Sequence, residues 1–280
     1  MESVFHSIIM SKRLGIIAGS GDLPIRLAQT ANKQSWEGCI IKISNFTKSN
    51  GWPQWPVYDF HIGKINSIFS KLHNEKVTHV ILCGGIKRPS LMELNPDLKA
   101  VQLMAKISFK GDDGALKVIS EAVENEGFKV LSVDHILKDS LAPLGHISGP
   151  KPTKEILKNI DKAIEVLKGL SSHDIGQSIV VQQGLVLAIE AIEGTDLMIS
   201  RAGKLKLSGN APIIVKAPKL GQDLKMDQPV IGPKTIDLAN HYGFSAIACA
   251  ANQVVIVDLS NVIIKAKKNK ITLYGFEFNK

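Results

Sequence analysis

The chain has 280 residues, a length that predicts one large or two ordinary domains with room for a buried core. Its hydrophobic content of 44% and charged content of 21% are typical of a globular protein that is not embedded in a membrane. The net charge of +8 favours anionic partners such as nucleotides or phospholipid surfaces. Nucleic acid is not expected, because the lysines are dispersed, aromatic residues make up 5% of the chain and no nucleic-acid motif is present.

The cysteines and the apolar runs of the sequence indicate the cellular compartment in which the protein is expected. Cys39, Cys83 and Cys249 lie far apart, which fits neither a disulfide framework nor a zinc site and indicates a reducing environment. No apolar run approaches membrane-spanning length. Residues 1–10 lack the basic and then apolar order of a secretory signal. We therefore expect a cytoplasmic protein.

Strand-like and helix-like segments alternate through the first half of the chain. Strands are expected at 13–18, 38–43, 77–83 and 129–133, and helices at about 22–32, 64–74, 97–107 and 113–126. Strands separated by helices predict a parallel sheet with helices on its faces, over residues 1–135. Asp22 is expected to be the N-cap of the first helix, and Pro24 suits its first turn.

The second half has a different organisation. Residues 136–152 are rich in proline, glycine and short polar side chains, so we expect a linker there. An amphipathic helix follows at 153–169, and then a hairpin of two strands. Further strands are expected near 213–216, 245–250, 253–257 and 271–275, with a helix near 234–242. Residues 153–280 are therefore expected to form a second α/β domain with a mixed sheet.

Two glycine-rich turns lie at the carboxyl ends of expected parallel strands, where such sheets bind ligands. Glycines allow the backbone to approach a ligand, and nearby cations suit phosphate. The candidate binding residues at these turns are Gly19, Ser20, Gly21, Asp22, Gly84, Gly85, Lys87 and Arg88. A nicotinamide-cofactor site is an alternative, but its fingerprint requires a small residue where this chain has Pro24.

Asp112 and Asp113 stand at the start of the helix expected at 113–126, before its stretch Ala115–Glu124. One interpretation is helix capping, with the carboxylates complementing the helix dipole. The other is that one of them faces a bound ligand. The sequence does not decide between the two.

The stretch 188–235 has the most unusual pattern, because its charged residues stand beside glycines and prolines. The charged residues concerned are Glu190, Glu193, Asp196, Arg201, Lys216, Lys219, Asp223, Lys225 and Asp227. Turns and strand ends are places where a rigid scaffold can aim binding and catalytic groups. Carboxylates completed by phosphate oxygens are the ligands that Mg²⁺ prefers, so we expect Mg²⁺ at Glu193, Asp196, Asp223 and Asp227. The alternative is a set of solvated turns.

Thr195 and Arg201 are candidate substrate-binding residues of this stretch. Thr195 is expected to cap a short helix that runs towards Arg201. A helix start presents free N–H groups and a partial positive charge, which suit a phosphate.

Asp223 and Asp227 are the expected catalytic carboxylates. They are four residues apart and share a face. Gln222, beside Asp223, is a further candidate catalytic residue. Lys216 and Lys219 are expected to offset the negative charge that develops on a departing phosphate.

Several motifs together resemble one family. The motifs are LGIIAGSGDLP, GGIKRPSLMEL, KGDDGAL, DIGQSIVVQ, EAIEGTDLMISRAG and KAPKLGQDLKMDQPVIGPKT. In order and over nearly the whole chain they resemble the LpxI type of UDP-2,3-diacylglucosamine pyrophosphatase. Lys225 and Gln228 depart from the Arg and Leu usual in that family, while the acidic positions are kept. The resemblance places an essential aspartate in the last motif without choosing between Asp223 and Asp227.

The resemblance implies a cytoplasmic hydrolase of lipid A biosynthesis in a Gram-negative bacterium. Such enzymes use Mg²⁺ to split UDP-2,3-diacylglucosamine into UMP and 2,3-diacylglucosamine 1-phosphate, which is lipid X. They have a Rossmann-like N-terminal domain, a linker and a distinct C-terminal domain, with the ligand between the domains. The basic chain also suits peripheral contact with the anionic inner face of the inner membrane.

The sequence leaves open the oligomeric state and two alternative functions. A homodimer is one candidate assembly. A non-catalytic nucleotide or lipid-phosphate binding protein is the alternative function, and a nucleotide-dependent oxidoreductase is a second alternative.

Overall fold

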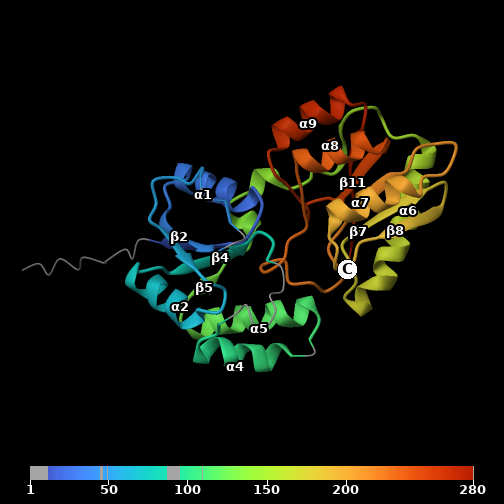
Figure 1. Ribbon diagram of the computed structural model, residues 1–280. Coiled ribbons are helices and arrows are strands. Elements are labelled where there is room, and N and C mark those ends of the chain that lie inside the picture. Colours follow the sequence, from blue (N-terminus) through green and yellow to red (C-terminus); the bar gives the residue numbers. More distant parts are fainter. Residues whose placement is uncertain (1–11, 45–46, 49, 87–94, 109, 280) are drawn as a thin grey trace, which may run out of the picture. The chain divides into compact units, whose positions relative to one another are not determined.

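The computed structural model describes residues 12–44, 47–48, 50–86, 95–108 and 110–279 (Figure 1). The chain forms two compact units. The N-terminal unit contains residues up to 108 and residues 118–136, and the C-terminal unit contains residues 109–117 and 137–280. The chain therefore changes unit at 108–109, 117–118 and 136–137. Lys87 and Arg88, expected to meet phosphate, lie outside the described residues.

Five described strands form the sheet of the N-terminal unit, and all of them pair in parallel in the order β3-β2-β1-β4-β5. They are β1 (Arg13–Ala18), β2 (Glu37–Ile43), β3 (Val57–Phe60), β4 (His79–Cys83) and β5 (Lys129–Val130). The predicted parallel sheet is confirmed. β1 is central and buried from Leu14 to Ala18, which explains its continuous apolar run. The edge strand β3 was not predicted, because its alternately exposed VYDF segment lacks such a run.

The described helices of the N-terminal unit are α1 (Leu23–Lys33), α2 (Ile65–Asn74), α4 (Leu98–Ile107) and α5 (Asp112–Asn125), of which α5 begins in the other unit. Helix α1 buries an apolar stripe at helical spacing, formed by Pro24, Leu27, Ala28 and Ala31. Asp22 occupies the N-cap position, as predicted, but its side chain makes no capping bond. The reason is its helical backbone conformation, whereas a capping residue is usually extended. Its carboxylate pairs with Lys48 instead, at 2.5 Å.

The main sheet of the C-terminal unit has six strands in the order β6-β13-β11-β9-β7-β8. They are β6 (Gly145–Ser148), β7 (Ser178–Gln182), β8 (Leu185–Ile189), β9 (Ile213–Lys216), β11 (Ala246–Ala250) and β13 (Thr272–Phe276). Strands β9, β11 and β13 are parallel, while β6, β7 and β8 pair antiparallel with their neighbours. A small parallel pair is formed by β10 (Val230–Ile231) and β12 (Val255–Ile256). The predicted mixed sheet is confirmed.

Four described helices pack against the C-terminal sheet. They are α6 (Lys154–Leu170), α7 (Thr195–Lys204), α8 (Pro233–His241) and α9 (Leu259–Lys268). Helix α6 contacts β7 and β9, whereas α7, α8 and α9 contact one another in sequence and lie against β8, β11 and β13. Thr153 caps α6 by accepting a hydrogen bond from the backbone N–H of Ile156 at 3.2 Å. One continuous apolar core joins these helices to the six strands.

Residues 136–152, expected to be a linker, are mostly folded into the C-terminal unit. They contain the 3₁₀ turn η2 (Lys138–Ser140) and the strand β6, which follow the 3₁₀ turn η1 (Val133–His135). Strand β6 pairs with β13, and the Ser148 hydroxyl donates to the carbonyl of Ile263 at 2.8 Å. Glycine and proline in this segment therefore shape an edge strand and its turns. Among the described helices, none is both long and apolar enough to cross a membrane.

Candidate functional site

Charged and polar side chains gather at one edge of the C-terminal sheet. The parallel strands β9 and β11 end there, and the antiparallel β7 begins there, with Ser178 opposite Lys216. The carboxyl ends of parallel strands are the usual ligand-binding edge of such sheets. We call this region the C-terminal edge.

Lys216 lies at the end of β9 and is almost fully buried, with 4% of its surface exposed. Its ammonium donates to Thr195 Oγ1 at 2.7 Å and to Ser178 Oγ at 2.9 Å, and Glu190 Oε2 lies 3.5 Å away. The Thr195 hydroxyl donates to Glu190 Oε1 at 2.7 Å. Burial disfavours the charged form of Glu190, but Lys216 and the two hydroxyls outweigh it and hold the pKa of Glu190 below its usual value.

The role found for Thr195 differs from the predicted cap. Helix α7 is preceded by Gly194 as its N-cap residue, and no side-chain cap is present. Thr195 is the first helical residue, and its hydroxyl is engaged with Lys216 and Glu190. The difference arises because the turn bends at Gly194, which has a φ of 79°.

Lys219 is buried and forms a second cluster with two partly buried carboxylates. Its ammonium pairs with Asp113 at 2.7 Å and with Asp174 at shorter distance, and the backbone N–H of Asp113 donates to Asp174 at 3.2 Å. Burial raises the pKa of Asp113 in spite of Lys219, and the negative charges of Asp174 and Asp227 add to that rise. Burial also acts on Asp174, but its hydrogen bonds from Lys219 and Asp113 hold its pKa below the usual value. Burial alone would lower the pKa of Lys219, but the two carboxylates together have the larger, opposite effect. The pKa of Lys219 is therefore raised above its usual value.

The structure distinguishes the two expected catalytic aspartates. Asp227 is partly buried, and its Oδ2 accepts hydrogen bonds from the side-chain amides of Gln177 and Gln222, both at 2.6 Å. Gln222 is itself fixed, because its side-chain oxygen accepts the backbone N–H of Lys219 at 2.9 Å. Asp223 is exposed, and its carboxylate accepts the backbone N–H of Lys225 at 3.0 Å within its own turn. The carboxylate of Asp227 is therefore held in one orientation by two neighbouring side chains, whereas that of Asp223 only stabilises its own turn.

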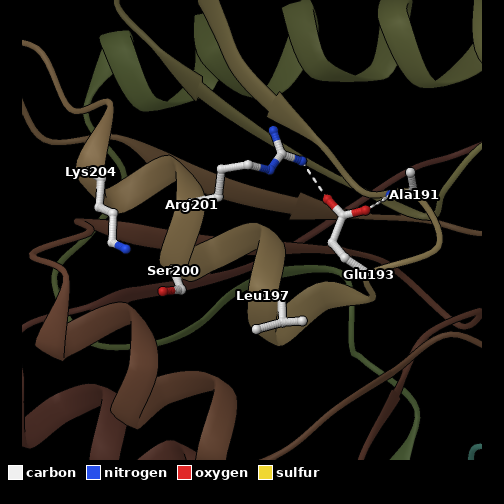
Figure 2. Close-up of a pocket in the computed structure, with 6 residues that line it drawn as sticks. All are labelled: Ala191, Glu193, Leu197, Ser200, Arg201 and Lys204. Carbon is white, nitrogen blue, oxygen red and sulfur yellow. Dashed lines mark hydrogen bonds and ion pairs between the residues drawn. The ribbon is translucent and has the colours of Figure 1, made fainter.

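The four residues expected to hold a metal lie in different local settings. Glu193 pairs with Arg201 and accepts the backbone N–H of Ala191 at 3.1 Å (Figure 2). Asp196 pairs with Lys234 at 2.6 Å. In the described part of the chain, no group of three or more histidine, cysteine, aspartate or glutamate side chains is arranged to hold a metal ion.

The two glycine-rich turns of the N-terminal unit lie together at the carboxyl edge of its sheet. Ser20 and Gly85 form an antiparallel bridge with main-chain bonds of 2.8 and 3.2 Å. The hydroxyl of Ser20 donates to the carbonyl of Gly85 at 2.9 Å. A side chain on Gly19 would lie 2.6 Å from the Gly85 carbonyl oxygen and 2.7 Å from that of Gly84. Both turns therefore lie at the carboxyl ends of parallel strands, as expected, and they are bonded to each other. Asp112 is an exposed residue at the start of α5.

Sequence reasoning did not assign a role to four side chains of the C-terminal edge. These are Asp174, Gln177, Ser178 and Glu190. Three of them belong to the short segment DIGQS, whose Ser178 is the first residue of the apolar strand β7. A signal was present, since polar residues at the start of a buried strand lie at a sheet edge. Their meeting with Lys216 and Lys219 depends on the antiparallel pairing of β7 with β9, which the spacing does not reveal.

The fold and this edge define a two-domain α/β protein with buried charged clusters at the end of its second sheet. Comparison with known families identifies the group. The chain belongs to the LpxI family, because the family model LpxI N-terminal domain matches residues 13–140 and LpxI C-terminal domain matches residues 143–274. A relative from Caulobacter vibrioides, named UDP-2,3-diacylglucosamine pyrophosphatase LpxI, is 33% identical over 275 residues, covering 95% of this chain and 98% of the relative.

Solved structures give more distant likenesses. CobK precorrin-6A reductase is 9% identical, with 96% of this chain and 89% of that chain covered and a TM-score of 0.35. The UDP-glucose 4-epimerase of Thermus thermophilus, in complex with NAD, is 16% identical, with 51% and 41% covered and a TM-score of 0.30. These likenesses are too weak to bear on function.

Proposed function

We propose that this protein hydrolyses the pyrophosphate bond of UDP-2,3-diacylglucosamine to UMP and 2,3-diacylglucosamine 1-phosphate in lipid A biosynthesis. Family membership over both domains and the similarity to the named Caulobacter vibrioides relative support this proposal. The observation that carries it is the carboxylate of Asp227, which is oriented by the side-chain amides of Gln177 and Gln222. Gln222 also accepts the backbone N–H of Lys219, whose ammonium is buried. The substrate is a pyrophosphate, for which an aimed carboxylate and nearby cations are suitable groups.

Hydrolysis joins a water oxygen to one phosphorus, breaks the bond from that phosphorus to the bridging oxygen, and releases a proton from the water. In the proposed reaction, Asp227 acts through Oδ1, as a metal ligand or by orienting the water, because Oδ2 is occupied by Gln177 and Gln222. Lys219 and Lys216 offset negative charge near the departing phosphate.

A divalent cation fits the charge of this edge. Asp113 and Asp174 pair with the ammonium of Lys219, and the negative charges of Asp174 and Asp227 raise the pKa of Asp113, so carboxylates outnumber the lysine in this cluster. Such an excess of negative charge would repel the pyrophosphate of the substrate unless a cation were bound together with the substrate. Mg²⁺ commonly binds through one or two carboxylates together with substrate phosphates, so it does not require a preformed set of three. We propose Asp227 as its main protein ligand, where Mg²⁺ would polarise the phosphate oxygens.

The N-terminal unit is proposed to bind the nucleotide or a phosphate of the substrate. Its joined turns, with Gly19, Gly84 and Gly85, bring backbone close to the carboxyl edge of the parallel sheet. Backbone without side chains is what a phosphate or a ribose can approach closely. The homodimer remains a prediction.

The decisive experiment incubates the purified protein with UDP-2,3-diacylglucosamine dispersed in detergent and Mg²⁺, and measures UMP. We expect UMP to appear in proportion to the protein, and to fall to background after chelation and return when Mg²⁺ is restored. Binding of the substrate without any UMP would instead favour the non-catalytic nucleotide or lipid-phosphate binding protein. Unchanged turnover after thorough chelation would contradict the proposed metal.

A further inference from the structure

The segment that joins β8 to α7 exposes two large apolar side chains. Ile192 has 98% of its surface exposed, and Leu197, in the first turns of α7, has 62% exposed. Single exposed apolar residues are ordinary, but an apolar group rimmed by polar residues marks an interaction surface.

Helical spacing continues this surface along α7. Leu197, Arg201 and Lys204 are separated by four and three residues, so they lie on one face of the helix. Figure 2 shows these three side chains along α7, where they line a pocket of about 510 Å³ together with Ala191, Glu193 and Ser200. We call Ile192, Leu197, Arg201 and Lys204 the β8–α7 surface.

The charge of the β8–α7 surface is positive. Glu193 neutralises Arg201, but Lys204 has no hydrogen-bond or ion-pair partner among the described residues. Beyond Lys204 the chain continues with Leu205 and Leu207, which are 51% and 42% exposed and flank Lys206. Exposed apolar side chains interleaved with lysines are typical of surfaces that lie on anionic bilayers.

A bilayer fits this surface better than a second copy of the chain. A twofold interface sets the same patch against itself, which would bring the unpaired Lys204 towards its own equivalent. An anionic bilayer instead offers headgroups to the lysine and acyl chains to Ile192 and Leu197.

The β8–α7 surface is also close in sequence to the C-terminal edge. Glu190 and Thr195 are directed towards the buried Lys216, while Ile192, between them in the sequence, is exposed. A protein held on a bilayer by Ile192 would therefore hold this edge close to the lipid.

We propose that the β8–α7 surface docks the protein on an anionic phospholipid bilayer. Ile192 and Leu197 insert at the boundary of the acyl chains, and Lys204 meets the headgroups. This inference rests on the proposed function, because a substrate with two acyl chains resides in such a bilayer.

The test is co-sedimentation of the full-length protein with vesicles of phosphatidylcholine, with and without phosphatidylglycerol. The wild type should bind the anionic vesicles more strongly, and added salt should weaken that binding. The double variant Ile192→Asp/Leu197→Asp should bind about tenfold or more weakly, since it removes the inserted apolar groups and adds two negative charges. The matched control is Ile264→Asp on α9, where an isoleucine is 65% exposed, and it should bind as the wild type does.

Three results would overturn the docking proposal. They are absence of wild-type binding to anionic vesicles, unchanged binding by the double variant, and an equal loss in the Ile264→Asp control. The proposed function is tested separately by UMP release from detergent-dispersed substrate, where the double variant should match the wild type. Absence of UMP from the wild type in detergent would reject the function and leave the vesicle result standing.

Discussion

The carboxyl edges of the sheets in the two units are stabilised by different kinds of interaction. In the N-terminal unit, the turns at Ser20 and Gly85 are held by main-chain hydrogen bonds, and Gly19 leaves no room for a side chain. In the C-terminal unit, the edge is made of ion pairs around Lys216 and Lys219. The first edge therefore depends on shape, and the second on balanced charge. Substitutions should affect the two in different ways.

The largest effect is expected when the buried ion pair at Lys216 is broken. Lys216→Met should lower the free energy of unfolding by about 3–5 kcal/mol, because it leaves the carboxylate of Glu190 buried without its counter-charge. Chemical denaturation at neutral pH measures this loss. The double variant Lys216→Met/Glu190→Gln is the control, and it should recover much of the stability because no unpaired charge remains.

The same pair gives the C-terminal edge a defined pH dependence. The folded pKa of Glu190 lies below its ordinary value of 4.5, so the pair contributes its full stability above pH 4.5. That contribution is lost as the pH falls through the folded pKa. Denaturation between neutral and acid pH should therefore show a weaker acid dependence in Glu190→Gln than in the wild type. An identical acid dependence would contradict the assigned shift.

The next effect concerns catalysis and separates the two aspartates. Asp227→Ala should lower kcat by about 10²–10³-fold, as loss of a principal charge-stabilising group does. Asp223→Ala should stay within about threefold of the wild type, because Asp223 is exposed and bonds within its own turn. UMP release by folded variants measures both. A large loss in Asp223→Ala with near-normal turnover in Asp227→Ala would reverse the assignment.

The stability of the N-terminal unit should depend on the volume of the side chain at residue 19. Gly19→Ala should lower stability by about 2 kcal/mol, because its new carbon meets the carbonyl oxygens of Gly84 and Gly85. Gly21→Ala is the matched control, since no atom lies within 4 Å of the added carbon, and its φ of 93° costs about 1 kcal/mol. Thermal unfolding distinguishes the two variants. Equal losses would show that backbone conformation, and not the close approach, governs this edge.

The smallest expected difference compares the two carboxylates that share Lys219. Asp174→Asn should cost about 1–2 kcal/mol at neutral pH, because it removes an ionised partner that lysine stabilises. Asp113→Asn should cost less, because the raised pKa of Asp113 means that its charged form is poorly accommodated. The contribution of Asp113 to stability falls as pH rises from 3.8 through its folded pKa. A larger loss in Asp113→Asn would contradict this order.

Much of the fold could be predicted from apolar patterning. The buried strands β1 and β4 were found because both of their faces are covered, which gives a continuous apolar run. The edge strands β3 and β6 were not found, because half-exposed residues beside glycine and proline resemble loops. Pairing across long sequence distances, such as β6 with β13, leaves little trace in local spacing.

The sequence predicted which residues belong to the candidate site better than it predicted the contacts between them. Unusual charges at turns indicated Lys216, Lys219 and Asp227, and all three lie at the C-terminal edge. The sequence could not show that Gln177 reaches Asp227 across 50 positions, because that contact depends on the pairing of β7 with β9. Nor could it show that Glu193 and Asp196 are neutralised by Arg201 and Lys234.

The changes of unit along the chain limit how the protein can be divided. Residues 109–117 belong to the C-terminal unit, although 118–136 of the N-terminal unit separate them from the rest of it. A fragment that begins at residue 137 would lack Asp113, and Lys219 would keep Asp174 as its remaining partner among the described residues. No single proteolytic cut or gene truncation therefore yields both units complete. Dissection of the two would require a transplanted peptide or a circularly permuted chain.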